Sequence, residues 1–371
     1  MYIRRLAKFL SGHHFVFIMQ KVINGIQQIG VGVRDAEEAF RWYAQHLGAD
    51  VKVFDDDSKA VDMAPYMGGE ARSKRALMAI NMQGGSGYEI WQYTNREPRE
   101  AVFQKQTGDL GINCGIIKSR DIQQSYSRLK KEGVEIVNGL AEDPSGNICF
   151  TISDPYGNQY IVKEFNSWFS RKQFDLGGLI GARIGVSDME ASLVLYKDIL
   201  GYNQVVFDET GEFADILGTG KQPGQRYRRV LLSHSNQRIG GFGRLFGKSE
   251  LELIQSLDRK PRKIFEDRWW GDLGFIHLCF DIRRMHALTQ ECAEHNFPFR
   301  VLSDESFGMG DVNGHFGYIE DPDGTLIEFV ETYRVPLIKK LRLHIDMSNR
   351  HPEKPLPSWM IRALALKRVR F

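Results

Sequence analysis

The sequence predicts an α+β protein of two tandem modules, each a pair of β-α-β-β-β units that form curved mixed sheets. Three observations support this prediction. At 371 residues the chain is too long for one ordinary domain. Residues 29–48 and 182–201 share one pattern of strand, Asp, helix, Tyr and Gly. Two tetrapeptides also recur in the same order: Gly108-Asp-Leu-Gly111 with Gly271-Asp-Leu-Gly274, and Asp154-Pro-Tyr-Gly157 with Asp321-Pro-Asp-Gly324.

Each module is expected to open with a strand and a helix. Asp35 and Asp188 are helix N-caps in this interpretation, and Gly48 and Gly201 end the helices. Strands then follow, around Val53, Leu77 and Tyr88 in the first module. A second strand, helix and strands repeat the order, with the second helices predicted at 122–132 and 285–295.

The last strand of the second module follows a turn. Asp321-Pro-Asp-Gly324 is turn chemistry, because Pro fixes φ and Gly supplies a positive φ. In the strand that follows, Glu328 shares one face with Leu326 and Val330. A carboxylate on such an apolar face is costly to bury without a partner. Glu328 is therefore either exposed on an edge strand or part of a polar site.

The predicted organisation has five parts. We expect an N-terminal extension at 1–21, a first module at 22–168, a linker at 169–175, a second module at 176–334 and a basic C-terminal tail at 335–371. In the extension, residues 11–14 (Ser-Gly-His-His) interrupt the apolar run, which makes it a poor signal peptide.

The C-terminal tail is the most basic part of the chain. Residues 331–371 contain ten Lys or Arg and three Asp or Glu. Leu337, Leu341 and Ile345 have the spacing of one helical stripe. The tail either docks on its own domain or associates weakly with a membrane or partner surface.

Composition limits the class of function. A formal net charge of +2 points to no nucleic acid or other polyanionic partner for the whole chain. The four cysteines form no C-x-x-C pair, which favours neither a disulfide framework nor a zinc ribbon and fits a reducing, cytoplasmic environment. No run of eighteen apolar residues is present, so no membrane-spanning helix is predicted.

The strand-Asp-helix-Tyr-x-x-x-x-Gly openings and the closing Asp-Pro-Asp-Gly-x-x-x-Glu together resemble the vicinal oxygen chelate superfamily, which includes glyoxalase I and extradiol dioxygenases. The resemblance covers residues 25–331 and implies sheets curved around a metal cleft. In that family each half-module can offer one metal ligand from its first strand and one from its last.

Of the two sets of ligand positions that the resemblance implies, one holds metal-binding residues and the other does not. Pairing the first half of module one with the second half of module two gives Gln28, Glu89, His277 and Glu328. The other cross-pair gives Cys114, Ile161, Gly181 and Glu252, which cannot hold a divalent ion. One intact site and one lost site are therefore expected. Taken alone, His277 would more often be a core residue and Glu89 a solvent-facing one.

The intact set is similar to that of eukaryotic-type glyoxalase I. It implies one divalent ion (Zn²⁺, Ni²⁺, Co²⁺, Mn²⁺ or Fe²⁺) that chelates vicinal oxygens of a small-molecule substrate and stabilises an enediolate or enolate. By the same resemblance Glu328 shuttles the proton, and Glu89 is a second base or a permanent ligand. The implied activity is that of a lyase or isomerase. Since one chain supplies the whole set, either a monomer or a homodimer is compatible.

Two departures from glyoxalase I affect the expected substrate. The glutathione-binding arginines of that family correspond here to Gly32 and Leu273, so a glutathione adduct is not expected. Two alternatives remain open at this stage. One is an Fe²⁺ extradiol-type dioxygenase, although such sites usually need two His and one carboxylate. The other is a non-catalytic module that binds a small molecule.

Overall fold

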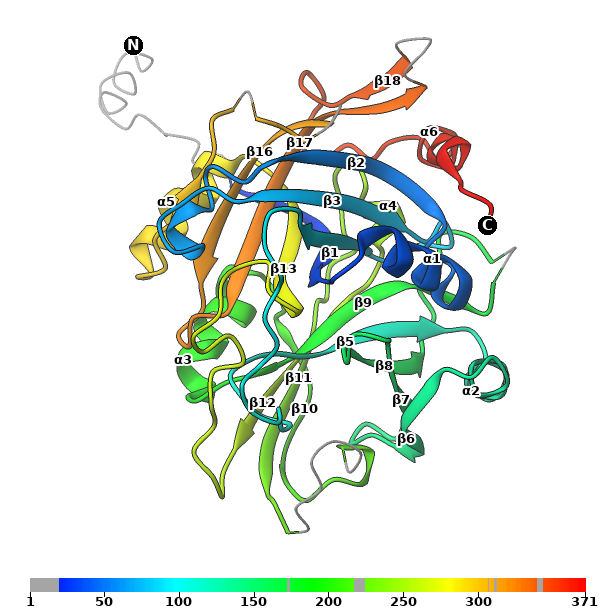
Figure 1. The fold of residues 1–371 in the computed structure, drawn as a ribbon, viewed down its shortest axis with the longest axis vertical. Helices are drawn as coiled ribbons and strands as arrows, with labels where there is room; N and C mark the ends of the chain where they lie inside the picture. The colour runs from blue at the N-terminus through cyan, green and yellow to red at the C-terminus, as the bar shows by residue number, and fades with distance from the viewer. Residues whose placement is uncertain (1–19, 172–173, 217–223, 306, 310–311, 339–342) are drawn as a thin grey trace, which may run out of the picture.

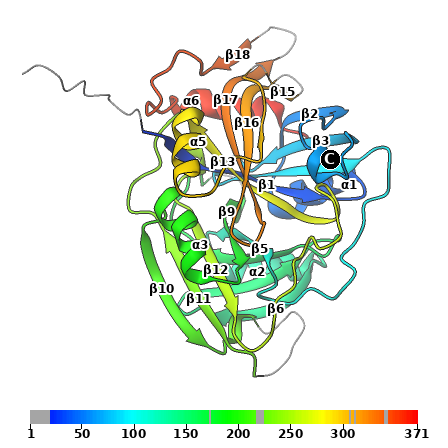
Figure 2. The same ribbon diagram turned by 90° about the vertical axis from the view of Figure 1, so that its left-hand side faces the viewer.

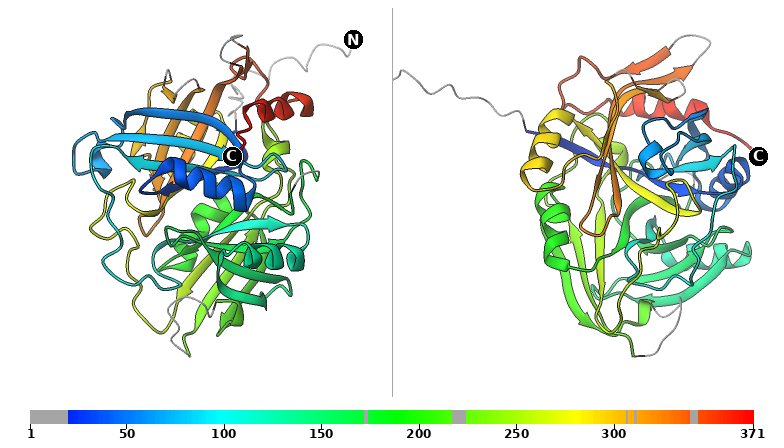
Figure 3. Two further views of the ribbon diagram at one scale, coloured as in Figure 1. Left: turned by 45° about the vertical axis from the view of Figure 1, so that its right-hand side comes forward. Right: turned by 60° about the vertical axis from the view of Figure 1, so that its left-hand side comes forward.

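The computed structural model describes residues 20–171, 174–216, 224–305, 307–309, 312–338 and 343–371. Two large sheets lie one above the other, and α1 (Ala36–Leu47) lies between them (Figures 1 and 3). The largest apolar cluster joins Phe40 of α1 to Ile29, Ile117 and Leu179 from both sheets. The predicted α+β class with curved mixed sheets is confirmed.

The upper sheet has ten strands. Its main path is β14 (Val301–Leu302), β16 (Val312–Glu320), β17 (Leu326–Ile338), β13 (Gly274–Arg283), β1 (Val22–Gly32), β4 (Gly87–Tyr93), β3 (Ser73–Ile80) and β2 (Val51–Lys59). Two short strands, β15 (Gly308–Met309) and β18 (Leu343–Asp346), pair with β16 and β17.

The lower sheet has eight strands, which Figure 2 shows below the upper sheet. Their order is β10 (Gln204–Gly211), β11 (Tyr227–Ser233), β12 (Glu250–Ser256), β9 (Leu176–Gly185), β5 (Gly111–Ser119), β8 (Gln159–Glu164), β7 (Ile148–Ser153) and β6 (Glu135–Glu142). Each sheet thus combines one half of each predicted module, joined by the antiparallel pairs β1–β13 and β5–β9.

The predicted helices are present. They are α1, α2 (Ile122–Lys131), α3 (Met189–Leu193, continued by one π-helical segment, Val194–Ile199) and α5 (Met285–Glu294). Asp35 caps α1 by accepting hydrogen bonds from the amides of Glu37 and Glu38, and Gly48 ends it with φ 68°. Short helical turns occur at Ala64–Tyr66, Ala214–Ile216 and α4 (Gly243–Phe246). No helix among the residues described is long and apolar enough to cross a membrane.

The residues that recur in the two modules are hydrogen-bond partners. Tyr43 donates to Asp154 (2.6 Å), and Tyr196 donates to Asp321 (2.9 Å). Asp321 also accepts from the amides of Asp323 and Thr325, and Gly324 completes the turn with φ 91°. Each Asp therefore holds a turn and ties the second half of its module to the helix of the first half.

The predicted helical stripe at Leu337, Leu341 and Ile345 is wrong. β17 runs on to Ile338 and pairs antiparallel with β18, with Val335 opposite Ile345. Pro336 would break an interior helical hydrogen bond, whereas an edge strand accepts it. Leu341 lies outside the described residues.

The rest of the C-terminal segment docks on the upper sheet through α6 (Ser358–Arg362) and a 3₁₀ turn, Ala363–Lys367 (Figure 3). Ile361 and Leu364 are buried, Lys367 donates to the carbonyl of Val53, and Arg368 forms an ion pair with Asp50 (2.9 Å). The segment therefore contributes to the apolar core of this sheet. Weak association with another surface stays a prediction.

Candidate metal centre

Four adjacent strands of the upper sheet carry the four residues of the expected intact set. In sheet order they are Glu328 on β17, His277 on β13, Gln28 on β1 and Glu89 on β4. All four are buried, with exposed fractions of 5% or less. Residues 28 and 328 both lie opposite Cys279, and Gly30 pairs with both His277 and Glu89. The strand register thus brings together residues that are far apart in the sequence.

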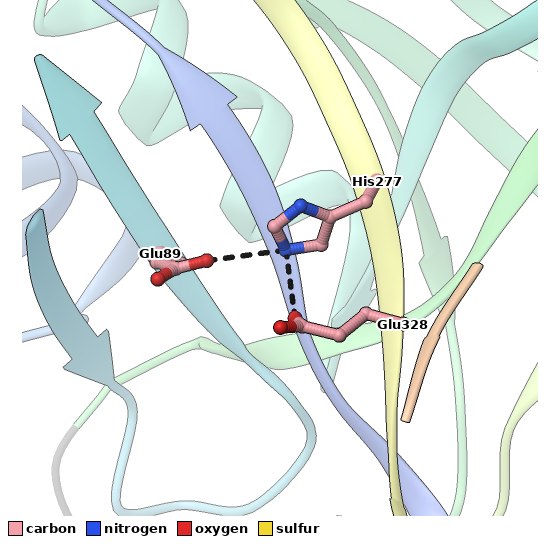
Figure 4. Close-up of side chains that lie close together, drawn as sticks. All are labelled: Glu89, His277 and Glu328. Atoms are coloured by element: carbon pink, nitrogen blue, oxygen red, sulfur yellow. Dashed lines mark ion pairs between the residues drawn. The ribbon is translucent and has the colours of Figure 1, made fainter. Parts of the chain in front are cut away.

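The side chains converge on one point. Nε2 of His277 lies 3.1 Å from Oε2 of Glu89 and 3.1 Å from Oε2 of Glu328, and the two glutamates reach it from different strands (Figure 4). The Gln28 amide lies 3.2 Å from Glu89 Oε2 and 3.4 Å from Glu328 Oε2. One ligand atom from each of Glu89, His277 and Glu328 lies within 4.8 Å of the others.

This geometry fits a shared cation better than direct hydrogen bonds. Nε2 of His277 is buried and has no aligned hydrogen-bond partner although both carboxylates are close, and Oε1 of Gln28 is also buried without a partner. Donor atoms that bind one ion at about 2.1 Å lie roughly 3 to 4 Å apart from one another. Imidazole nitrogen with carboxylate and amide oxygens is a donor set that divalent transition metals accept.

The charge of the cluster also favours a cation. Burial lowers the pKa of His277, but Glu328 and Glu89 outweigh burial and raise it to about 10 in the metal-free protein. The cluster thus places two buried carboxyl groups around one imidazole. Buried charge is costly unless paired. A divalent ion would remove this cost by displacing the proton from the imidazole.

The His277 ring is held on three sides. Trp270 stacks near it with ring centroids 6.2 Å apart, and the Tyr318 hydroxyl lies 3.4 Å from Nδ1. The third contact is Gly30 on the neighbouring strand, where an added Cβ would lie 2.4 Å from the ring. Groups that orient a ligating imidazole affect its metal affinity. These contacts leave Nε2 facing the carboxylates.

A bulge in β1 turns two successive glutamines toward the same cavity. The register with β13 shifts between Ile26 and Gln28, so Gln27 is the extra residue, and both amides line the cavity. Gln27 Nε2 donates to Asp281 (3.1 Å). Burial raises the pKa of Asp281 to about 6, despite its hydrogen bonds. Asp281 therefore fixes the Gln27 side chain beside the cluster.

The equivalent place in the lower sheet is filled by ion pairs. In the upper sheet His277 lies opposite Gly30, and at the corresponding position of the lower sheet Cys114 lies opposite Arg183. Arg183 therefore takes the place of the glycine that leaves room for the imidazole. Glu252 accepts from Arg183 (3.0 Å) and Arg229 (2.6 Å), and Arg229 also binds Asp215 (2.6 Å). All four charged side chains are buried. The two guanidinium groups occupy the place that a cation would need.

The four converging residues were expected from the family resemblance, but their surroundings were not. Tyr318 is opposite Glu328 on the neighbouring strand, and this could be inferred only from the register. Arg183 offered a usable signal, because a single charged residue inside the apolar strand Leu176–Gly185 needs a buried partner. Arg229 and Asp215 carried no comparable signal.

We predict that Gly30→Ala weakens metal binding by about 10- to 100-fold, because the added methyl group displaces the His277 ring. Competition with a chromophoric chelator measures the affinity. Gly211→Ala is the matched control, since an added Cβ there has no atom within 4 Å. Wild-type affinity in Gly30→Ala would contradict the assigned role of Gly30.

We predict that Arg229→Met lowers the free energy of unfolding by about 3 to 5 kcal/mol at pH 7, because it leaves two buried carboxylates, Glu252 and Asp215, with the single guanidinium of Arg183. Burial alone would raise the pKa of Glu252, but Arg183 and Arg229 lower it to about 2. The pairing therefore stabilises the fold above about pH 4.5 and is lost as the pH falls toward 2, so the deficit of the variant should shrink over that range.

Urea unfolding at several pH values tests this. Arg226→Met, which removes an exposed ion pair with Asp258, serves as the control and should change stability little. An equal effect of the two substitutions, or a deficit that is independent of pH, would show that the buried network is not the cause.

Comparisons with known proteins bear on the family and the fold. The family model described as the Glyoxalase/Bleomycin resistance protein/Dioxygenase superfamily matches the chain twice, at residues 25–161 and 179–329. No significant match was found among functionally curated proteins.

Solved structures show the same fold. Glyoxalase I from Zea mays aligns with a TM-score of 0.51 at 13% identity, covering 84% of this chain and 92% of that one. A putative dioxygenase from Bacillus subtilis aligns with a TM-score of 0.54 at 15% identity, covering 84% and 86%. The two family matches together span most of the chain, and the chain therefore belongs to the Glyoxalase/Bleomycin resistance protein/Dioxygenase superfamily.

Proposed function

We propose that this protein is a divalent-metal-dependent lyase or isomerase that moves a proton between adjacent carbons of a small molecule bearing two neighbouring oxygens. The observation that carries this proposal is the convergence of two buried carboxylates and one imidazole beside a cavity. Gln28, Glu89, His277 and Glu328 would hold the ion. When bound, the ion would stabilise negative charge on the oxygens of an enediolate or enolate.

The chain's own residues supply the acid and base. Glu89 and Glu328 reach the centre from β4 and β17 and meet at Nε2 of His277. A substrate bound beside them would have a carboxylate within reach of its oxygen-bearing carbons, as a proton shuttle requires. We assign the transfer to Glu328 and give Glu89 the role of second base or permanent ligand. His277 and Gln28 keep the carboxylates in place.

The alternative of an extradiol-type dioxygenase is less well supported. Such sites usually combine two histidines with one carboxylate. Within the part of the chain that the structure describes, the cluster holds one histidine and two carboxylates. The likeness to a putative dioxygenase, at 15% identity, extends to the fold alone.

The proposal extends to the oligomeric state and the cellular environment of the protein. One chain supplies all four residues, so a monomer could form the complete centre. The four cysteines are buried and free, which supports a reducing, cytoplasmic environment.

We predict that Glu328→Gln lowers turnover by at least about 100-fold while metal stays bound, because the amide still offers an oxygen but cannot carry the proton. Candidate substrates are α-hydroxy ketones, 2-oxoaldehyde thiol adducts and epimerisable acyl thioesters. Exchange of the substrate's C–H with deuterated solvent, followed by NMR, measures the proton step directly.

Glu320→Gln on the neighbouring strand is the matched control, since Glu320 contacts Tyr66 and Arg300 away from the cluster. Unchanged exchange in Glu328→Gln would remove Glu328 from the mechanism. Loss of metal in that variant would instead show a role as an essential ligand.

A further inference from the structure

A cavity opens from the candidate metal centre into the upper sheet. Gln28, Glu89 and Glu328 line one end of it, and most of the other residues that line it are apolar. Two chelated oxygens and their carbons would fill only the polar end, so most of the cavity is left for another part of the substrate.

The remainder of the cavity is apolar and is built from distant parts of the chain. β2 and β3, the short helix α4, β16, β17 and the C-terminal segment all contribute, through Val53, Ile80, Phe246, Phe316, Val330 and Leu364. Leu364 is kept in place by the docking of the segment on β2, where Lys367 donates to the Val53 carbonyl. The docked C-terminal segment is thus one wall of the cavity.

The polar groups of the cavity do not suit an anion. Glu89 and Glu328 are carboxylates, and the other polar side chains that line it are Gln27, Gln28, Asn313, His315 and Thr332. None of the described residues that line the cavity is a lysine or arginine. A carboxylate or phosphate on the substrate would therefore be desolvated with no lysine or arginine to pair it.

We infer that the substrate carries an uncharged apolar tail, alkyl or aryl, attached to the oxygen-bearing carbons and buried in this cavity. The inference rests on the proposed function for what binds at the polar end of the cavity. Binding of an apolar group at the other end does not require the proposed reaction. Each methylene added to the tail should tighten binding about fourfold until the cavity is full.

Two fluorescent probes with the same ring system test the inference on the full-length protein. N-phenyl-1-naphthylamine is neutral, and 8-anilinonaphthalene-1-sulfonate adds one negative charge. The neutral probe is expected to bind at least tenfold more tightly than the sulfonate. Methyl esters of increasing chain length should displace it, each methylene lowering the competition constant.

A substitution that places a charge in the cavity tests whether the probes bind there. Val312 is half-buried, lines the cavity and lies on β16, whereas Val205 is exposed on β10 of the other sheet. Val312→Arg should weaken binding of the neutral probe at least tenfold and strengthen binding of the sulfonate. Val205→Arg should change the affinity for neither probe. Near-ultraviolet circular dichroism checks that both variants keep the fold.

The outcomes separate the two proposals. Equal binding of both probes, tighter binding of the sulfonate, or equal effects of the two arginine variants would overturn the neutral apolar tail. If metal-depleted protein binds the neutral probe as described while the metal-loaded protein shows no proton exchange with any substrate, the proposed function fails and the tail assignment stands.

Discussion

The antiparallel pairing of β1 with β13 is the interaction on which the candidate centre depends. β1 comes from the start of the chain and β13 from its last third, and their register places Gly30 directly opposite His277. β4 adds Glu89 on one side of this pair, and β17 adds Glu328 on the other. A slip of one residue would turn these side chains to the opposite face, so the same hydrogen bonds that join the two modules also define the centre.

The two sheets fill equivalent positions with different side chains. In the upper sheet a glycine leaves room for the imidazole, which lies 3.1 Å from each of two carboxylates. In the lower sheet Arg183 stands at the position of that glycine, and with Arg229 it neutralises Glu252 and Asp215. The lower cluster is internally paired and needs no ion. Its arginines pair with carboxylates, whereas the carboxylates of the upper sheet face an imidazole.

Much of the fold could be predicted because its signals are local and repeated. Asp35 and Gly48 define α1 through cap chemistry that any chain segment can show, and the closing Asp-Pro-Asp-Gly turn is of the same kind. The convergence of Gln28, Glu89, His277 and Glu328 was expected only through the resemblance to a known family. The contacts of His277 with Trp270 and Tyr318, and the pairing of Arg183 with Glu252, depend on tertiary register that composition and spacing do not contain. The helical stripe within the tail was misassigned because a helical spacing of three apolar residues outweighed Pro336.

The most direct test of the single cross-module centre is the metal content of the untagged protein by plasma mass spectrometry. His277→Ala is compared with Cys114→Ala, the substitution at the equivalent position of the lower sheet. The account predicts about one equivalent of a divalent transition metal in the wild type and in Cys114→Ala, and none in His277→Ala. Wild-type protein without metal, or metal retained in His277→Ala, would contradict it.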